Sequence, residues 1–210
     1  ATTTAPPIDE GPPGPFTGAD DVVVDPSASV DPSLRLGRPL KVMLAGDSVG
    51  WSLGWKMKGR YDDAQVQLDD RAIIGCGVMP RESMFVVKGR PPEQYAPPCR
   101  EVELAEFRGL GERPDVVVFW MGAWEVYDHQ YSGFNYRLGT KPYAKFLEGR
   151  IQERVDKFRS VGAATVIPIV PCFGRNAARL GSERLQPKRI DWINDRIRAR
   201  EVRLIGQDGA

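Results

Sequence analysis

The stretch Lys41-Val-Met-Leu-Ala-Gly46-Asp47-Ser48-Val-Gly-Trp51 decides how the rest of the chain is organised. Its first half, Val42 to Ala45, is a short apolar run typical of a buried strand. Gly46-Asp47-Ser48 interrupts that run with turn-forming residues, and Ser52 to Met57 can continue as a helix. The sequence therefore predicts a strand, a tight turn at Ser48 and a helix.

A serine on a strand-to-helix turn has two physical advantages as a nucleophile. Its hydroxyl projects at the carboxyl end of the strand, where open α/β sheets place their sites. Its backbone N–H lies at a helix N-terminus, where a developing negative charge is stabilised. The alternative is an ordinary helix cap, because Ser, Asp and Gly are the commonest residues at such turns.

Length and charge narrow the class of protein. The chain has 210 residues, enough for one α/β domain with a substantial core. Its 29 Lys and Arg nearly balance its 28 Asp and Glu, so charge gives no argument for nucleic acid or an anionic membrane surface. The longest apolar run, Val116 to Trp124, is about half the ~20 residues of a membrane span. No signal peptide is visible, and because residue 1 is Ala we expect a processed or cut piece of a longer chain.

Residues 1–39 differ in composition from the rest. They hold many of the chain's 18 prolines, as in Ala5-Pro6-Pro7 and Gly11-Pro12-Pro13-Gly14-Pro15. Such a segment cannot pack a core, so it is predicted to be a Pro-rich linker to something upstream, with a single domain over residues 40–210.

Strand and helix patterns alternate through that domain. Asp115 to Met121 is a continuous β-branched and aromatic run, typical of a central parallel strand, and Pro142 to Val161 has the spacing of an amphipathic helix. The alternation predicts an α/β protein with a three-layer α/β/α, doubly wound parallel sheet. The other segments are expected as strands at 64–68, 164–170 and 202–205, helices at 99–110 and 187–200, and irregular loops at 80–98, 129–140 and 171–185.

Three cysteines leave two possibilities open. Cys76 and Cys99 both lie in loop-like sequence on either side of an irregular segment. A disulfide between them would close a loop of about 24 residues, worth about 3 kcal/mol, and would indicate an oxidising, extracytoplasmic compartment. The alternative is three reduced thiols in a cytosolic protein. Cys172 has no evident partner under the first interpretation.

Gly46-Asp47-Ser48 after the first strand of a domain resembles the first conserved block of the SGNH (GDSL-like) hydrolase family. That family includes esterases, carbohydrate deacetylases and O-acyltransferases on a flavodoxin-like fold. The resemblance implies Ser48 as the nucleophile. It also implies an oxyanion-hole glycine after the second or third strand, for which Gly75 is the candidate and Gly77 the alternate.

The third block of the family is Gly-x-Asn-Asp, and here the matching place reads Gly122-Ala-Trp124-Glu125. The missing asparagine normally donates to the oxyanion, so the indole N–H of Trp124 is the candidate replacement. Gly-x-Trp-Glu followed by Val-Tyr-Asp128 resembles the SGNH domains fused behind membrane-embedded acyltransferase-3 domains of bacterial cell-surface O-acyltransferases. Glu125, Asp128 and Asp47 are candidates for organising the site or binding sugar hydroxyls.

The fourth block, Asp-x-x-His, supplies the general base and the carboxylate that orients it. Asp208 matches the Asp, but the sequence ends at Ala210, without the histidine. Absent residues, a splice at Ile205-Gly206 or the loss of the base would each explain this, and we favour absent residues. His129 is the chain's one histidine and the alternate base, since its pKa suits that task.

These patterns lead to one functional hypothesis with two alternatives. We expect serine-dependent O-acyl, usually acetyl, transfer from an acyl donor to a cell-envelope glycan or glycolipid. The chain would be an extracytoplasmic domain tethered to an upstream membrane acyltransferase. The alternatives are a free-standing carbohydrate esterase or deacetylase, and a non-catalytic glycan-binding domain on the same fold. No cofactor, metal site or nucleic-acid partner is expected, and Trp51, Trp55 and Trp124 are candidates for stacking on a sugar or for core packing.

Overall fold

The computed structural model describes residues 37–57, 66–174 and 179–206, with side chains described up to residue 198. The architecture below is that of the unit Arg38–Ala210. Most of the predicted linker, together with Asp208, lies outside the described residues. No helix within the described ranges has the length and apolar character needed to cross a membrane.

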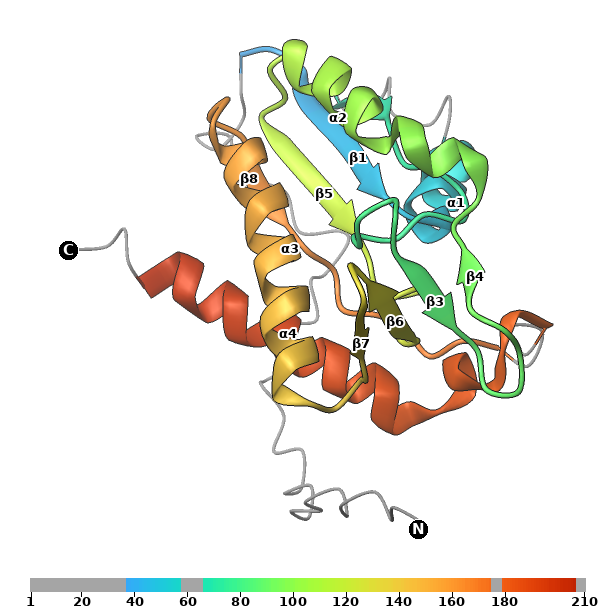
Figure 1. Ribbon diagram of the computed structural model, residues 1–210. Helices are drawn as coiled ribbons and strands as arrows, with labels where there is room; N and C mark the ends of the chain where they lie inside the picture. The colour runs from blue at the N-terminus through green and yellow to red at the C-terminus, as the bar shows by residue number, and fades with distance from the viewer. Residues whose placement is uncertain (1–36, 58–65, 175–178, 207–210) are drawn as a thin grey trace, which may run out of the picture. The chain divides into compact units, whose positions relative to one another are not determined.

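A four-stranded parallel sheet forms the centre of the fold (Figure 1). Its strands are β1 (Leu40–Gly46), β2 (Val66–Asp70), β5 (Val116–Trp120) and β8 (Ala164–Val166), in the order β2-β1-β5-β8. β1 pairs with β2 on one side and with β5 on the other, so it occupies an interior position. Ser48, which follows β1, therefore lies at the carboxyl edge of an interior strand, as the sequence predicts.

Three helices connect these strands: α1 (Ser48–Met57), α2 (Val102–Gly111) and α3 (Lys141–Arg159). A short 3-10 helix, η3 (Pro97–Glu101), leads into α2. Right-handed crossovers place α2 and α3 on one face of the sheet and α1 on the other, as Figure 1 shows. Thr140 caps α3 by accepting a hydrogen bond from the Tyr143 N–H. The α/β class and the parallel sheet are thus present.

A second, antiparallel sheet was not expected from the sequence. It has the order β4-β3-β6-β7, from β3 (Met84–Val86), β4 (Glu93–Gln94), β6 (Asp128–Tyr131) and β7 (Phe134–Tyr136). The loop predicted for residues 129–140 is wrong, because a hairpin turns at Ser132 and Gly133, with φ of 51° and 81°. The 80–98 loop prediction is also wrong in part, because β3 pairs with β4 inside that segment and with β6 further along the chain.

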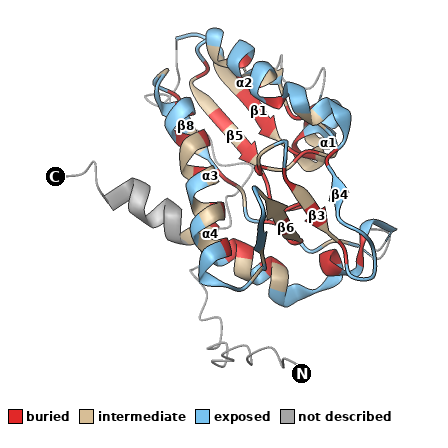
Figure 2. Ribbon diagram, viewed as in Figure 1, coloured by how far each residue is buried: buried red, intermediate tan, exposed pale blue. Residues whose placement is uncertain are grey.

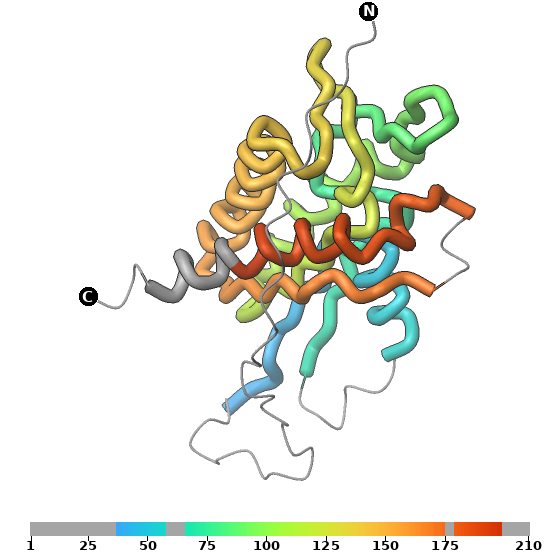
Figure 3. Tube along the Cα trace, turned by 90° about the horizontal axis from the view of Figure 1, so that it is seen from below, coloured from blue at the N-terminus to red at the C-terminus, as the bar shows by residue number. Residues whose placement is uncertain are grey.

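The end of the chain also differs from the prediction. α4 runs from Pro187 to Gly206, so residues 202–205 continue a helix where a last strand was expected. Ile190, Ile193 and Ile197 keep helical spacing on its buried side, and the sequence holds no Gly or Pro before Gly206 that would stop the helix. Figure 3 shows α4 running alongside the segment that follows β8, where the Asn194 side chain bonds both the N–H and the carbonyl of Val170.

The core lies between the parallel sheet and the surrounding helices, and its buried residues are marked in Figure 2. Met43 and Val117 are completely buried on β1 and β5, as expected for strands covered on both faces. α3 contributes a stripe of buried residues at helical spacing, which confirms the amphipathic helix predicted for residues 142–161: Tyr143, Leu147, Ile151, Val155 and Phe158.

Candidate active site at the carboxyl edge of the sheet

Ser48 is the first residue of α1 and is half-buried. The turn before it depends on Gly46, whose φ is +106° and whose added Cβ would stand 1.7 Å from the Trp120 carbonyl oxygen. The Asp47 N–H donates to that same oxygen at 3.0 Å, which holds the turn against the end of β5. Because Ser48 is the first residue of the helix, its N–H has no acceptor within the helix. A free N–H on the nucleophile itself is one of the donors that an oxyanion hole needs.

Asp47 is a buried cap and not an exposed substrate ligand, with 1% of its surface exposed. Its Oδ1 accepts from the Val49 N–H at 2.8 Å, and its Oδ2 accepts from the Ala123 N–H at 3.3 Å. Burial, together with the nearby carboxylate of Glu125, raises the pKa of Asp47 to about 7. Asp47 thus joins the serine turn to the Gly122–Glu125 segment through one side chain.

Glu125 also holds the Gly122–Glu125 segment in place, through hydrogen bonds to two backbone N–H groups. It is fully buried, and its two oxygens accept from the N–H groups of Val78 at 2.7 Å and Gly122 at 2.6 Å. Burial raises its pKa. Gly77 is required beside it, since an added Cβ would stand 2.3 Å from Glu125 Oε1. With both oxygens engaged by the backbone, Glu125 organises the turns at the ends of β2 and β5 and does not face a substrate.

The two candidates for the oxyanion hole lie close together. Gly75 has a φ of +85°, and a Cβ added there would be 4.0 Å from the Trp124 ring. Trp124 is 9% exposed, packs edge-on against Phe85 at 5.0 Å between ring centroids, and keeps its Nε1 buried without a hydrogen-bond partner. An indole nitrogen buried in this way belongs to the packing of the second sheet. Trp124 is therefore the weaker of the two candidates.

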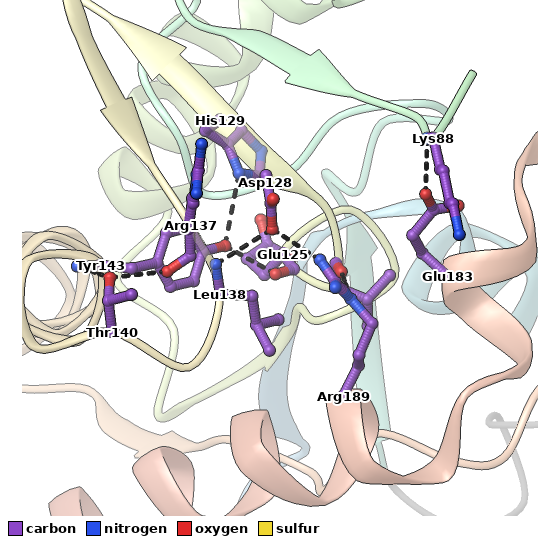
Figure 4. Close-up of polar contacts among 11 residues, drawn as sticks. Lys88, Glu125, Asp128, His129, Arg137, Leu138, Thr140, Tyr143, Glu183 and Arg189 are labelled. Carbon is purple, nitrogen blue, oxygen red and sulfur yellow. Dashed lines mark hydrogen bonds and ion pairs between the residues drawn. The ribbon is translucent and has the colours of Figure 1, made fainter. Parts of the chain in front are cut away.

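His129 is held deep in the second sheet. Its Nε2 lies 2.8 Å from the Tyr95 hydroxyl. Its Nδ1 lies 3.3 Å from the hydroxyl of Tyr143, which Figure 4 shows beside it. Burial lowers its pKa to about 4, so the ring is neutral at pH 7. Both nitrogens are occupied and no hydrogen bond joins the ring to Ser48, so the alternate role of His129 as the serine's base does not fit this geometry.

Asp128 holds the hairpin against α4. Its Oδ1 accepts from the Leu138 N–H at 3.0 Å and from Arg189 Nη2 at 2.7 Å, as Figure 4 shows. Arg189 Nε also donates to the Val126 carbonyl at 2.6 Å. The contacts of Asp128 are therefore structural.

The predicted disulfide is present between Cys76 and Cys99, whose Cα atoms are 5.3 Å apart. It ties the loop after β2, which carries Gly75 and Gly77, to the start of η3. Cys172 is exposed and free.

Arg184 is a residue near the site that sequence reasoning did not assign a role. It is 5% exposed, and its guanidinium lies 4.5 Å from the Trp124 ring, with Nε and Nη2 lacking hydrogen-bond partners. The positive charge of Arg184 partly offsets the rise that burial and Glu125 cause in the pKa of Asp47, so Arg184 acts on the turn that carries Ser48. Neighbouring Glu183 accepts from the Lys88 N–H at 2.7 Å (Figure 4). The polar composition of residues 171–185 predicts a loop, and it gives no sign that Glu183 and Arg184 are buried.

A separate cavity of about 350 Å³ lies between the disulfide loop, α2 and α3, and Ser48 does not line it. Among its lining arginines, Arg81, Arg150 and Arg154 each form an ion pair with a glutamate. Its positive charge is therefore largely balanced within the protein. Among the residues described, no group of three or more His, Cys, Asp or Glu side chains is arranged to hold a metal ion.

The fold and the site together define an α/β protein with a serine at the first position of a helix, at the carboxyl edge of its parallel sheet. Among solved structures, the chain is similar to an acetyl xylan esterase, AlAXEase, with 17% sequence identity and a TM-score of 0.46, over 76% of this chain and 71% of that chain. A likeness at this level does not bear on activity. Neither models of known protein families nor curated proteins give a match.

Proposed function

We propose that this chain performs serine-dependent O-acyl chemistry on carbohydrates, with Ser48 as the nucleophile. The observation that carries the proposal is the position of Ser48, on the first turn of α1 directly after an interior parallel strand. The Gly46 turn and the Asp47 cap hold it there, at the edge where such sheets bind ligands.

In the proposed reaction, Ser48 Oγ attacks the carbonyl carbon of an acyl ester while a general base takes the hydroxyl proton. The N–H groups of Ser48 and Gly75 stabilise the oxyanion of the tetrahedral intermediate. The bond to the donor oxygen then breaks, and the donor leaves with a proton. Attack on the acyl-serine by a sugar hydroxyl gives transfer, and attack by water gives hydrolysis.

The base in this scheme is not His129, because that ring is occupied by two tyrosines. The resemblance noted above assigns the role to a histidine shortly after Asp208, which is not in the 210-residue sequence. We propose transfer to a cell-envelope glycan, by an extracytoplasmic domain tethered to a membrane acyltransferase. The disulfide between Cys76 and Cys99 supports an oxidising compartment.

The test is release of acetate from acetylated xylo-oligosaccharides by a chain that includes the histidine expected after Asp208, with and without chitotetraose, which carries no O-acetyl groups, as acceptor. Ser48→Ala should abolish release, whereas Ser52→Ala, one turn further along α1, should leave it unchanged. Release that survives Ser48→Ala would reject Ser48 as the nucleophile. Acetyl groups appearing on chitotetraose would favour transfer, and free acetate alone would favour the esterase alternative.

A non-catalytic glycan-binding domain is the second candidate. The burial of Trp124 Nε1 and the enclosure of His129 favour it, because these residues were the candidate replacements for the missing asparagine and the missing base. Glycan binding unaffected by Ser48→Ala, in a protein with no acetate release, would support this candidate over the enzyme.

A further inference from the structure

Two tryptophans on α1 face solvent. Trp51 is 37% exposed and Trp55 is 59% exposed, in contrast to the buried Trp124. Their ring centroids are 6.2 Å apart and their planes are parallel within 2°. Tryptophan carries a large apolar surface, and adjacent exposed apolar side chains are characteristic of binding sites. The core-packing alternative therefore does not apply to these two residues.

The pair shares a helix face with Ser48. At 100° per residue, Trp51, Trp55 and Ser48 fall within an arc of about 60°. The adjoining side of α1 is buried through Gly50 and Gly54, whose mean direction is about 110° around the helix from the centre of that arc. Along the axis, Trp51 lies about 4.5 Å and Trp55 about 10.5 Å beyond Ser48, from the helical rise. The aromatic row thus begins next to the candidate nucleophile and leads away from it.

We propose that Trp51 and Trp55 form a binding subsite for sugar rings of the glycan whose ester or hydroxyl reacts at Ser48. This assignment rests on the proposed function. The C–H faces of sugar rings are flat and apolar, and they match the faces of parallel indole rings.

The polar groups around the row favour a sugar over a membrane surface. Asp70 lies against Gly54, where an added Cβ would stand 2.4 Å from its Oδ2, and Lys56 Nζ is 4.7 Å from the centre of the Trp55 ring. A carboxylate on the flank of the row and an ammonium over one of its rings can both bond to sugar hydroxyls. Anionic lipid would gain from Lys56 but would be repelled by Asp70.

The experiment measures binding without turnover, in the Ser48→Ala background, by isothermal titration calorimetry with xylotetraose, chitotetraose and mannotetraose. We expect at least one of these to bind, with affinity reduced about tenfold or more by adding Trp51→Ala and Trp55→Ala, as for loss of central aromatic contacts. Phe107→Ala is the matched control, because Phe107 is 74% exposed on α2. It should leave binding unchanged. Trp55→Ala alone tests the subsite with the more exposed ring.

Failure of all three sugars to bind, or equal binding by the double variant, would overturn the subsite. Loss of co-sedimentation with phosphatidylglycerol vesicles in the double variant, with sugar binding intact, would overturn it in favour of a membrane surface. Because Ser48 is absent from the binding assay, the outcome is separate from catalysis. Sugar binding that needs the tryptophans supports the subsite even if acetate release never depends on Ser48.

Discussion

Glu125 gives the most sharply defined prediction for stability. Glu125→Ala removes the carboxylate that accepts from the N–H groups of Val78 and Gly122. Each buried N–H left without an acceptor costs about 1–3 kcal/mol, so the two together predict a loss of roughly 2–6 kcal/mol. A typical domain has a free energy of unfolding of about 5–15 kcal/mol, so this variant should be close to the limit of folding.

Glu125→Gln should be less harmful than Glu125→Ala. Its amide oxygen can still accept from one N–H, while the amide NH2 faces the other, so about one of the two costs remains. The assay is urea unfolding with the disulfide intact, followed by circular dichroism and by tryptophan fluorescence, with coincident transitions as the check for two-state behaviour.

The matched control is Glu82→Ala, because Glu82 is an exposed glutamate whose partner is Arg81. It should leave the unfolding midpoint almost unchanged. Two results would show that Glu125 does not hold the two turns together: a loss of unfolding free energy below about 1 kcal/mol for Glu125→Ala, or a larger loss for Glu125→Gln than for Glu125→Ala.

Three further predictions follow from the same region. Burial raises the pKa of Asp47 to about 7, so the folded chain keeps a proton that the unfolded chain releases near pH 4. The contribution of Asp47 to the free energy of unfolding should therefore fall as pH rises from about 4 to 7. In urea titrations at a series of pH values, Asp47→Asn should flatten that dependence. Paired serines at Cys76 and Cys99 should lower the free energy of unfolding by about 3 kcal/mol, and reductant should do the same to the wild type only. Gly122→Ala should destabilise the fold by at least about 2 kcal/mol, since its Cβ would stand 2.1 Å from Val170 at a φ of +113°, whereas Gly149→Ala, in open space on α3, should be neutral or stabilising in thermal melts.

Local sequence patterns were enough to predict the parts of the fold that rest on continuous apolar runs. The strand before Gly46 and the helix after it, the central strand at Val116–Trp120 and the helix at Lys141–Arg159 all agree with expectation. In each case the residues that decide the element are neighbours in the chain.

The second sheet escaped prediction because its stability comes from pairing between distant segments. Met84–Val86 is only three residues long and pairs with Asp128–Tyr131. Neither segment has a strong pattern of its own, and the tight turn at Ser132-Gly133 is the one local signal that could have indicated the hairpin.

The place of Ser48 in the fold could be predicted, but the electrostatics around it could not. Ser48 could be located from the turn that contains it. The buried roles of Asp47 and Glu125 depend on the backbone N–H groups of residues 123 and 78, which are 76 and 47 residues away in sequence and come near only in the folded chain. The enclosure of His129 likewise depends on two tyrosines, at 95 and 143, that are far away in sequence.

The most direct test of Ser48 as an activated nucleophile uses a chain long enough to include the histidine expected shortly after Asp208. It is labelled with a serine-directed fluorophosphonate, and the adduct is located by intact mass and peptide mapping. We expect a single adduct on Ser48 that is absent from Ser48→Ala and retained in His129→Gln, because His129 bonds to tyrosines and not to the serine. Loss of the adduct in His129→Gln, with the fold intact by circular dichroism, would contradict the role assigned to that histidine. An adduct elsewhere, or none at all, would contradict the assignment of Ser48.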